Sequence, residues 1–526
     1  MRKSGAVVLC LCVSALKASI CFLPTAAVAA GSEYEGLLAE LTAADVAADR
    51  AWDAVKTPEE LAARRADLRA KMIKAIGGFP ARCPLNPVVT GTVKRDGYRV
   101  EKVMFESRPR LHVTALAFVP DETRFKPPYP AVAVTCGHAL EGKAHDIYQR
   151  ACVLGAKEGF LMLVYDPFGQ GERVTGPYAN CTEHNRFGAA AICHGRSTAG
   201  FRIWDGMRAL DYLQSRSDVK SDRLGLMGNS GGGTMTSLIM ALEPRLKAAA
   251  PSCYISTIRD VVRSIGPQDA EQCVWGQLKD GINHASLVLM ADAAVRLQFS
   301  EGDFFPIAGA KSTYDVVRRT AERIGRSERY SATVVPGPHG WKESSIRSSL
   351  DWMRQWLMDE QPNGKSSADY AALDKDFDAK KADMGLSLKD SYVTPTGRTD
   401  ALKGERTPDD VLVDDLIGEG TPRLVFRETV SAQHSYYGAK TAAEENAVMA
   451  LMLGRSLVAD RTQQILSAAR AFAKQEGKKP VLVAYETWEA PAAHAFAAHP
   501  ELFAGFKSLG DGWFSGAKCD IIPPKP

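Results

Sequence analysis

Between residues 129 and 358, short apolar runs alternate with longer amphipathic stretches. The apolar runs have the length of buried strands and comprise Ala131–Thr135, Leu161–Tyr165, Leu224–Met227, Lys247–Ala250, Val295–Phe299 and Ala332–Val335. The amphipathic stretches have helical periodicity and comprise residues 147–158, 198–214, 231–242, 314–324 and 343–358. Strands and helices in alternation predict an α/β fold, a mostly parallel sheet with helices on both faces.

Two β-rich runs, residues 88–106 and 111–120, precede this alternation and predict an antiparallel entry into the sheet. The residues before them read as helical and polar-faced. We therefore expect four parts: a signal peptide at 1–30, a helical extension at 31–87, a catalytic domain at 88–360 and a second domain at 361–526.

The sharpest motif follows the apolar run at Leu224–Met227. Gly228-Asn-Ser-Gly-Gly232 is a G-x-S-x-G followed by a helical pattern, the strand–turn–helix context of a nucleophile elbow. Glycines are needed there because the serine occupies a strained turn in which neighbouring Cβ atoms would clash. The alternative is a glycine-rich turn with an incidental serine, but the context favours Ser230 as a nucleophile.

A serine hydroxyl needs a neighbouring base, and the base needs an orienting acid. In a fold of this kind both follow the serine, at the ends of later strands. Asp303 follows the run at 295–299 and His339 follows the run at 332–335. Glu301 is the rival acid. His284 is the rival base, but it precedes the acid in the chain, so we predict the set Ser230, Asp303 and His339.

The oxyanion of an acyl-transfer intermediate needs two preorganised donors. The backbone N–H of Gly231, directly after the nucleophile, is the first candidate. The loop after the first parallel strand supplies the second, from His138 or Ala139, and the sequence leaves this choice open. His138 could equally anchor that loop.

Further polar residues are candidates for substrate contacts or for structure. The candidates for substrate binding are Gln170, Asp269, Glu271, Gln272 and His284. An acidic loop such as 269–272 can instead be merely solvated. Within the glycine-rich segment at 166–173 we expect an internal ion pair of Glu172 with Arg173, and on the next helix a pair of Asp205 with Arg208.

Composition and the N-terminus bear on partners and compartment. A net charge of +3 without a dense basic run gives no support to nucleic-acid binding. Arg2 and Lys3, the apolar stretch Ala6–Leu16 and small residues up to Ala30 predict a secretory signal peptide. Lys17 interrupts the apolar stretch, which disfavours a membrane anchor. We expect a soluble mature protein in the periplasm or secreted.

Eight of the 11 cysteines lie beyond the predicted signal peptide. Cys181 with Cys193, and Cys253 with Cys273, are candidate disulfides in an exported protein. Cys136 and Cys152 fall in core elements, where buried thiols are expected. The sequence has no C-x-x-C pair, so it predicts no zinc site, and the proposed chemistry requires no metal or organic cofactor.

The C-terminal part repeats features of the elbow region. Gly454–Arg461 is similar to Gly195–Arg202, and both precede a helical pattern and an apolar strand. Thr487 stands at the place of Ser230, and bulky residues replace the flanking glycines. The pattern predicts a truncated, degenerate second hydrolase half without a nucleophile.

From Tyr98 to about Leu357 the chain resembles bacterial α/β-hydrolases of the acetyl xylan esterase-like or prolyl-oligopeptidase-like kind. The pieces that carry the resemblance are Cys136–His138, Asp166–Arg173, Gly195–Ser197, Trp204-Asp205, Gly228–Gly233, Asp303–Pro306 and His339-Gly340. The chain lacks a β-propeller-like repeat ahead of this region, and its elbow lacks the arginine-asparagine pair of glucuronoyl esterases.

The resemblance implies a serine hydrolase acting on esters, often acetyl groups on plant polysaccharides. We therefore expect an exported carboxylic-ester hydrolase whose substrate is an acetylated polysaccharide or oligosaccharide. A serine peptidase of the same fold and a non-catalytic carbohydrate-binding scaffold are the alternatives.

Overall fold

The computed structural model describes residues 9–11, 20–21, 30–174, 184, 187–188, 191, 196–375, 377–406, 408, 411, 449, 452–453, 457–476, 479, 481–484, 495–503 and 505–508. The chain forms two compact units. One comprises Thr42–Ala439, and the other comprises Met1–Leu41 with Lys440–Pro526. Each unit is described by itself.

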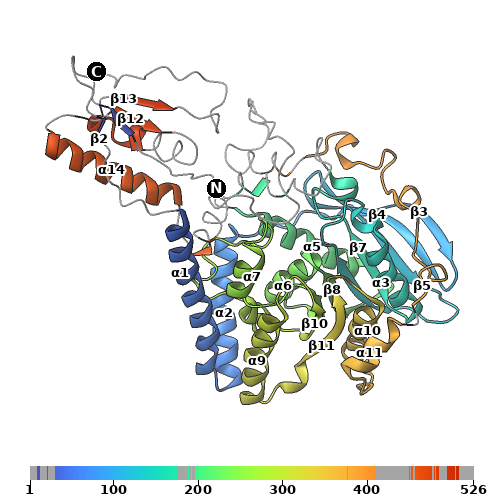
Figure 1. Ribbon diagram of the computed structural model, residues 1–526. Helices are drawn as coiled ribbons and strands as arrows, with labels where there is room; N and C mark the ends of the chain where they lie inside the picture. Colours follow the sequence, from blue (N-terminus) through green and yellow to red (C-terminus); the bar gives the residue numbers. More distant parts are fainter. Residues whose placement is uncertain are drawn as a thin grey trace. The chain divides into compact units, whose positions relative to one another are not determined.

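The larger unit is built on a nine-stranded sheet in the order β11-β10-β9-β8-β6-β7-β5-β4-β3 (Figure 1). The strands from β6 onward are mutually parallel, whereas β3, β4 and β5 join at one edge in antiparallel pairs. Their bounds are β3 Val88–Arg95, β4 Tyr98–Arg108, β5 Leu111–Pro120, β6 Tyr129–Thr135, β7 Leu161–Tyr165, β8 Val219–Asn229, β9 Leu246–Ser252, β10 Ala294–Gly302 and β11 Tyr330–Pro338.

Helices cover both faces of this sheet because each buried strand presents apolar side chains to both sides. In β6, Ala131 and Ala133 pack into one apolar cluster, and Val132 and Val134 pack into the other. The first cluster lies under α2, α5, α6, α8 and α9, and the second under α3 and α10. The helices are α1 Ala30–Arg50, α2 Pro58–Ala75, α3 Asp146–Lys157, α5 Thr198–Ser215, α6 Gly231–Leu242, α7 Ile258–Ile265, α8 His284–Met290, α9 Ile307–Arg323, α10 Glu343–Leu357 and α11 Ser367–Leu373.

The predicted parallel sheet, its helices on both faces and the antiparallel entry are confirmed. Between β9 and β10 the chain also forms the short helix α7, at Ile258–Ile265. Within this unit, the part of the N-terminal segment that carries Trp52 and Arg65 packs against α8 and the residues after it. Arg65 of α2 donates hydrogen bonds to the backbone oxygens of Leu289 and Ala291, and Trp52 donates one to Ser286 Oγ.

The smaller unit contains α14 Leu457–Glu476 and a sheet in the order β13-β12-β1-β2. Its strands are β1 Leu9–Leu11, β2 Ile20–Cys21, β12 Val481–Ala484 and β13 Gly505–Ser508. The helix before residues 481–484 and the strand there confirm those two expected elements, and β12 runs parallel to β13. Thr487 lies outside the described residues, so the degenerate elbow stays a prediction. Only β1 and β2 of the predicted signal peptide are described before residue 30.

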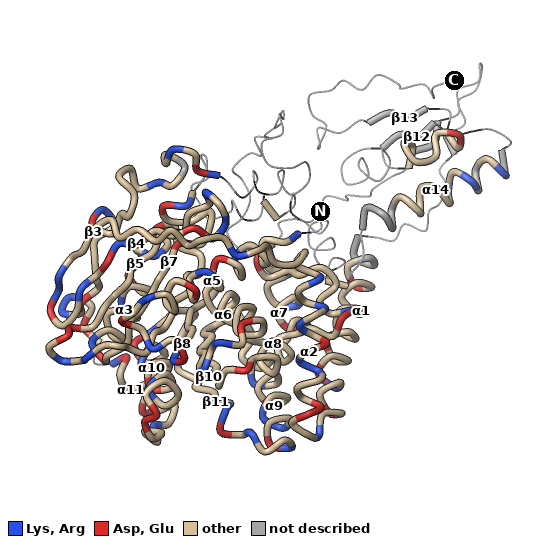
Figure 2. The backbone as a smooth tube through the Cα atoms, turned by 180° about the vertical axis from the view of Figure 1, so that it is seen from behind, with Lys and Arg blue, Asp and Glu red and all other residues tan. Residues whose placement is uncertain are grey.

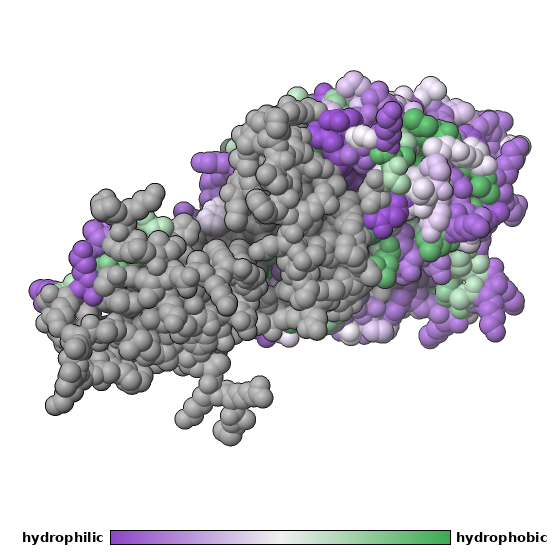
Figure 3. All heavy atoms as spheres, turned by 90° about the horizontal axis from the view of Figure 1, so that it is seen from above, coloured by the Kyte–Doolittle hydropathy of each residue, from purple (hydrophilic) through white to green (hydrophobic). Residues whose placement is uncertain are grey.

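Figure 2 shows Lys and Arg interspersed with Asp and Glu along the described helices. Seen from above, the described atoms mix hydrophilic and hydrophobic residues (Figure 3). Within the part of the chain that the structure describes, none of the helices combines the length and apolarity that a membrane crossing requires.

One of the two disulfides considered from the sequence is absent from the structure. Cys253 and Cys273 are both free and buried, so the disulfide considered between them does not form. Cys136 and Cys152 are buried free thiols, as expected. Cys181 and Cys193 lie outside the described residues.

Candidate active site

Ser230 occupies the turn between β8 and α6 with φ 60° and ψ −127°. A non-glycine residue in this region is strained by about 1–3 kcal/mol and persists only where its surroundings enforce it. The turn is held by the Ser230 N–H, which donates to the Ser252 carbonyl over 3.0 Å. Close packing explains the neighbouring glycine at 232, since a Cβ there would lie 2.1 Å from the Thr135 carbonyl oxygen. The elbow geometry expected from G-x-S-x-G is therefore present.

Asp303 and His339 lie directly after β10 and β11, two adjacent parallel strands. Their side chains form a hydrogen bond of 2.8 Å between His339 Nδ1 and Asp303 Oδ1. The Asp303 side chain is 3% exposed, and the imidazole is 21% exposed, which leaves the ring within reach of solvent. Glu301, the rival acid, is exposed. The structure thus brings together the acid and the base that the sequence selected.

Cys253 connects this pair to the elbow. It follows Ser252, whose carbonyl accepts the Ser230 N–H, and its Sγ lies 3.5 Å from the Gly340 carbonyl oxygen. Donor atoms of Cys253, Asp303 and His339 all lie within 4.8 Å of one another. Burial, with a contribution from the Asp303 charge, raises the pKa of the Cys253 thiol to about 12. The thiol is therefore protonated near neutral pH and is a poor nucleophile.

The loop after β6 lies against the start of α6, where the predicted oxyanion donors are found. A Cβ on Gly137 would lie 3.1 Å from the Gly231 nitrogen, so the absent side chain allows this approach. Gln170 fixes the loop by donating to the carbonyls of Gly137 over 2.7 Å and Ala139 over 3.0 Å. Because Gln170 is fully buried, its observed role is to hold this loop. Its predicted contact with substrate stays a prediction.

A second polar cluster lies beside the elbow. His138 Nε2 is 2.6 Å from Asp269 Oδ2 and 3.8 Å from Glu271 Oε1. Gln272 donates to Asp269 Oδ1 over 3.3 Å, and His184 Nε2 lies 3.3 Å from Asp269 Oδ2. The acidic loop is therefore buried rather than solvated, and three predicted substrate residues lie with His138. Whether they contact substrate stays a prediction.

Protonation in this cluster follows from burial and pairing. Burial, helped by the Arg202 charge, lowers the pKa of His184 to about 3, although Asp269 opposes the shift. Burial would raise the pKa of Asp269, but the charge and hydrogen bond of His138, followed by the contact with His184, hold it well below its ordinary value. Asp269 is thus ionised and His184 neutral near neutral pH.

The remaining predicted substrate residue, His284, is buried at the start of α8. Its Nδ1 faces the backbone of Ser256, and its Nε2 lies 3.1 Å from the Tyr254 hydroxyl. Burial lowers its pKa to about 4. These contacts place His284 in a packed structural setting, and a substrate contact there stays a prediction.

Three residues in and around the site were missed by the sequence reasoning. Lys143 lies in the same loop as His138, and its Nζ is 2.6 Å from both Asp166 Oδ2 and Glu172 Oε2. Arg202 pairs with Glu271, and His184 lies beside His138. Of the three, only Arg202 stands between apolar neighbours in the sequence, and the partners of all three are remote in the chain.

The expected local ion pairs differ in the structure. Glu172 pairs with Lys143 rather than with its neighbour Arg173. Arg173 pairs instead with Asp205 over 2.7 Å. Arg208, expected to pair with Asp205, pairs with Asp211 over 2.7 Å. Tertiary packing thus selects partners other than the nearest ones in sequence.

Comparisons with known proteins agree with this fold. A model of an abhydrolase family matches residues 36–263, a range that includes Ser230 and ends before Asp303. The protein YtaP of Bacillus subtilis (strain 168), named as a hydrolase, is 28% identical over 202 residues, which cover 36% of this chain and 64% of that protein. The match thus spans slightly less than two thirds of that relative.

Among solved structures, the methylesterase BT1017 is similar with a TM-score of 0.52 and 19% identity, covering 73% of this chain and 79% of that one. A glucuronoyl esterase from Solibacter usitatus has a TM-score of 0.45 and 17% identity, covering 57% of this chain and 94% of that one. The sheet topology, the elbow and the likeness to BT1017 define the class: the larger unit has the α/β-hydrolase fold. The chain resembles bacterial enzymes of that fold.

Proposed function

We propose that the larger unit is a serine carboxylic-ester hydrolase. The observation that carries this proposal is the 2.8 Å hydrogen bond between Asp303 and His339 at the strand ends beside the Ser230 elbow. Catalytic hydrogen bonds often form fully only when substrate binds, so we propose that Ser230 Oγ donates to His339 Nε2 in the substrate complex.

In the proposed reaction, Ser230 Oγ attacks the ester carbonyl carbon while His339 Nε2 takes the hydroxyl proton. Asp303 orients the imidazole and stabilises its charged form. The N–H of Gly231 and that of His138 or Ala139 receive the developing oxyanion. His339 then returns the proton to the leaving alcohol, and the acyl group stays on Ser230. Water activated by His339 attacks the acyl-enzyme and releases the acid.

For the substrate we propose an ester of a carbohydrate, with an acetyl group removed from a polysaccharide or oligosaccharide. The resemblance of the elbow and loop motifs to acetyl xylan esterase-like hydrolases supports this choice. The methylesterase name of BT1017 makes a methyl ester the substrate class to compare. We further propose export to the periplasm or the medium, supported by the charged and apolar pattern of residues 2–16.

The test measures acetate release from an aryl acetate and from acetylated xylan, and methanol release from a methyl-esterified uronic acid polymer. Ser230→Ala should lower kcat by on the order of a million-fold and Asp303→Asn by roughly ten-thousand-fold. Glu301→Gln is the matched control, because Glu301 is exposed and lies two residues from Asp303. It should turn over like the wild type.

Each outcome separates the alternatives. If the wild type hydrolyses one of the polymers and Ser230→Ala does not, the result would support both the serine mechanism and the carbohydrate substrate class. Turnover of the aryl ester alone would retain the mechanism and refute the carbohydrate substrate. An equal loss in Glu301→Gln and Asp303→Asn would refute Asp303 as the specific acid. No hydrolysis of any ester would favour the peptidase or the non-catalytic alternative.

A further inference from the structure

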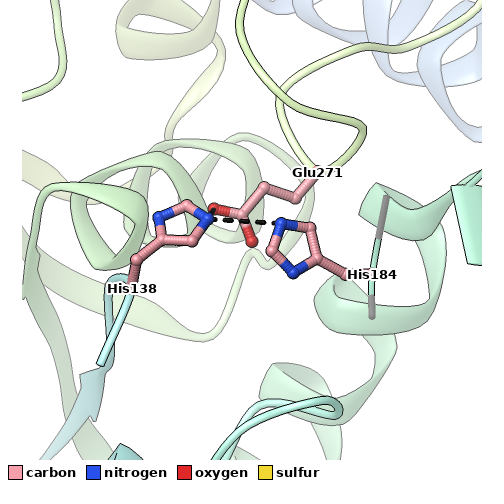
Figure 4. A group of neighbouring side chains, drawn as sticks. All are labelled: His138, His184 and Glu271. Atoms are coloured by element: carbon pink, nitrogen blue, oxygen red, sulfur yellow. Dashed lines mark hydrogen bonds and ion pairs between the residues drawn. The ribbon is translucent and has the colours of Figure 1, made fainter. Parts of the chain in front are cut away.

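Two imidazoles and two carboxylates converge beside the elbow, from segments far apart in the chain. His138 and His184 face each other with 3.2 Å between their Nε2 atoms. Figure 4 shows both rings directed at the carboxylate of Glu271, whose Oε1 lies 3.8 Å from His138 Nε2. Asp269 Oδ2 lies 2.6 Å from His138 Nε2 and 3.3 Å from His184 Nε2. One donor atom from each of His138, His184 and Glu271 thus lies within 4.8 Å of the other two.

Hydrogen bonds among these side chains do not satisfy all of their donor and acceptor atoms. If both Nε2 atoms carry hydrogen, both donate to the same Asp269 oxygen. Within the described part of the chain, neither oxygen of the fully buried Glu271 accepts a hydrogen bond, although Arg202 forms an ion pair at Oε2. Buried carboxylate oxygens are usually hydrogen-bonded or coordinate a metal, since desolvation is costly otherwise. A cation between the rings would accept lone pairs from both imidazoles and from Glu271 Oε1.

The donor set and its spacing suit a transition-metal ion. Two His nitrogens with a carboxylate form a common set for Zn²⁺, with Zn–N and Zn–O distances of about 2.0–2.2 Å. Tetrahedral angles then separate neighbouring ligand atoms by about 3.3 Å. The 3.2 Å and 3.8 Å separations from His138 Nε2 lie on either side of that value. Donor atoms of His138, His184 and Glu271 all fall within 4.8 Å of one another.

The cluster also adjoins the proposed chemistry. A Cβ on Gly231 would lie 2.6 Å from Glu271 Oε1 and 3.2 Å from His138 Nδ1. An ion here would therefore lie next to the start of α6, the helix that follows Ser230. It would also join three parts of the chain: the loop after β6, His184, and the buried loop at 269–272.

We propose that His138, His184 and Glu271 form a binding site for a divalent transition-metal ion of the Zn²⁺ type, with Asp269 hydrogen-bonded beside them. The ion would tie the three parts of the chain together beside the nucleophile. This inference does not depend on ester hydrolysis, because metal binding is measured without substrate.

The first experiment measures metal content by mass spectrometry after the full chain is stripped with a chelator, reloaded with Zn²⁺ and dialysed. About one ion per chain should remain, and Co²⁺ in its place should give the intense visible absorption of a tetrahedral site. Bound Zn²⁺ should also raise the Tm, since an ion that binds only the folded state stabilises it. A wild-type protein that retains no ion and shows no cobalt band would overturn the proposal.

The second experiment locates the site. His184→Asn should weaken Zn²⁺ affinity by at least about 100-fold, since even changes beyond the direct ligands cost 10–100-fold. His145→Asn is the matched control, because His145 caps α3 through its side chain and Asn is also a favourable cap. It should bind Zn²⁺ like the wild type. Equal affinity in His184→Asn and the wild type would place any ion elsewhere and refute the assignment. If His184→Asn does not fold, the wild-type stoichiometry and cobalt spectrum decide.

Discussion

Replacing Lys143 with methionine would remove the cation from a buried ion cluster that supports the candidate active site. The Lys143 side chain is 1% exposed, and those of Asp166 and Glu172 are 0% and 2% exposed. Its Nζ contacts both carboxylates at 2.6 Å. The same loop carries His138, so this cluster fixes the segment from which an oxyanion donor is expected.

The size of the expected loss in stability depends on which hydrogen bonds the two carboxylates retain without the lysine. Asp166 retains hydrogen bonds from the Thr114 hydroxyl and from two backbone N–H groups. Glu172 retains those of Val393 N–H, Thr394 N–H and the Thr394 hydroxyl. These donors satisfy lone pairs but leave two buried negative charges without a cation. Removing one partner of a buried pair typically costs about 3–5 kcal/mol. We expect Lys143→Met to lower the free energy of unfolding by that amount.

The assay is urea unfolding followed by tryptophan fluorescence, with the midpoint and slope compared among variants. Lys157→Met is the matched control, because Lys157 pairs with Asp383 at 3.0 Å with both side chains about one-third exposed. An exposed pair contributes about 0–1 kcal/mol, so the control should unfold near the wild type. If Lys143→Met lost no more than Lys157→Met, the buried cluster would not stabilise the fold, and our reasoning would be refuted.

Two further predictions concern packing and reactivity. Gly232→Ala should lower the Tm and cost about 1–3 kcal/mol or more, because its Cβ would lie 2.1 Å from the Thr135 carbonyl oxygen. Gly91→Ala, whose nearest neighbour would lie at 3.5 Å, is the control, and equal Tm values would contradict the clash. Cys253 should resist alkylation at pH 8, where a pKa of about 12 leaves about one thiolate in ten thousand. Mass spectrometry should find the half-buried Cys83 labelled before Cys253, and faster labelling of Cys253 would contradict the raised pKa.

The sequence by itself determined the elements and their class. Apolar runs of strand length and amphipathic stretches of helical period set the order of the six parallel strands and of α3, α5, α6, α9 and α10, because these periods follow from local backbone geometry. The elbow could also be predicted from the sequence, since Ser230 needs glycines at fixed neighbouring positions. Strand ends are local features too, so Asp303 and His339 could be selected by their place after two strands.

Only the tertiary structure decided which side chains meet. Arg173 lies beside Glu172 in the chain yet pairs with Asp205, and Glu172 pairs with Lys143. His138 meets His184, which lies 46 residues away, and both meet the buried loop at 269–272. Such contacts depend on how loops fold over the sheet edge, and no local period encodes them. Desolvation then fixes the partners, because a buried charge must find a counter-charge wherever packing brings one.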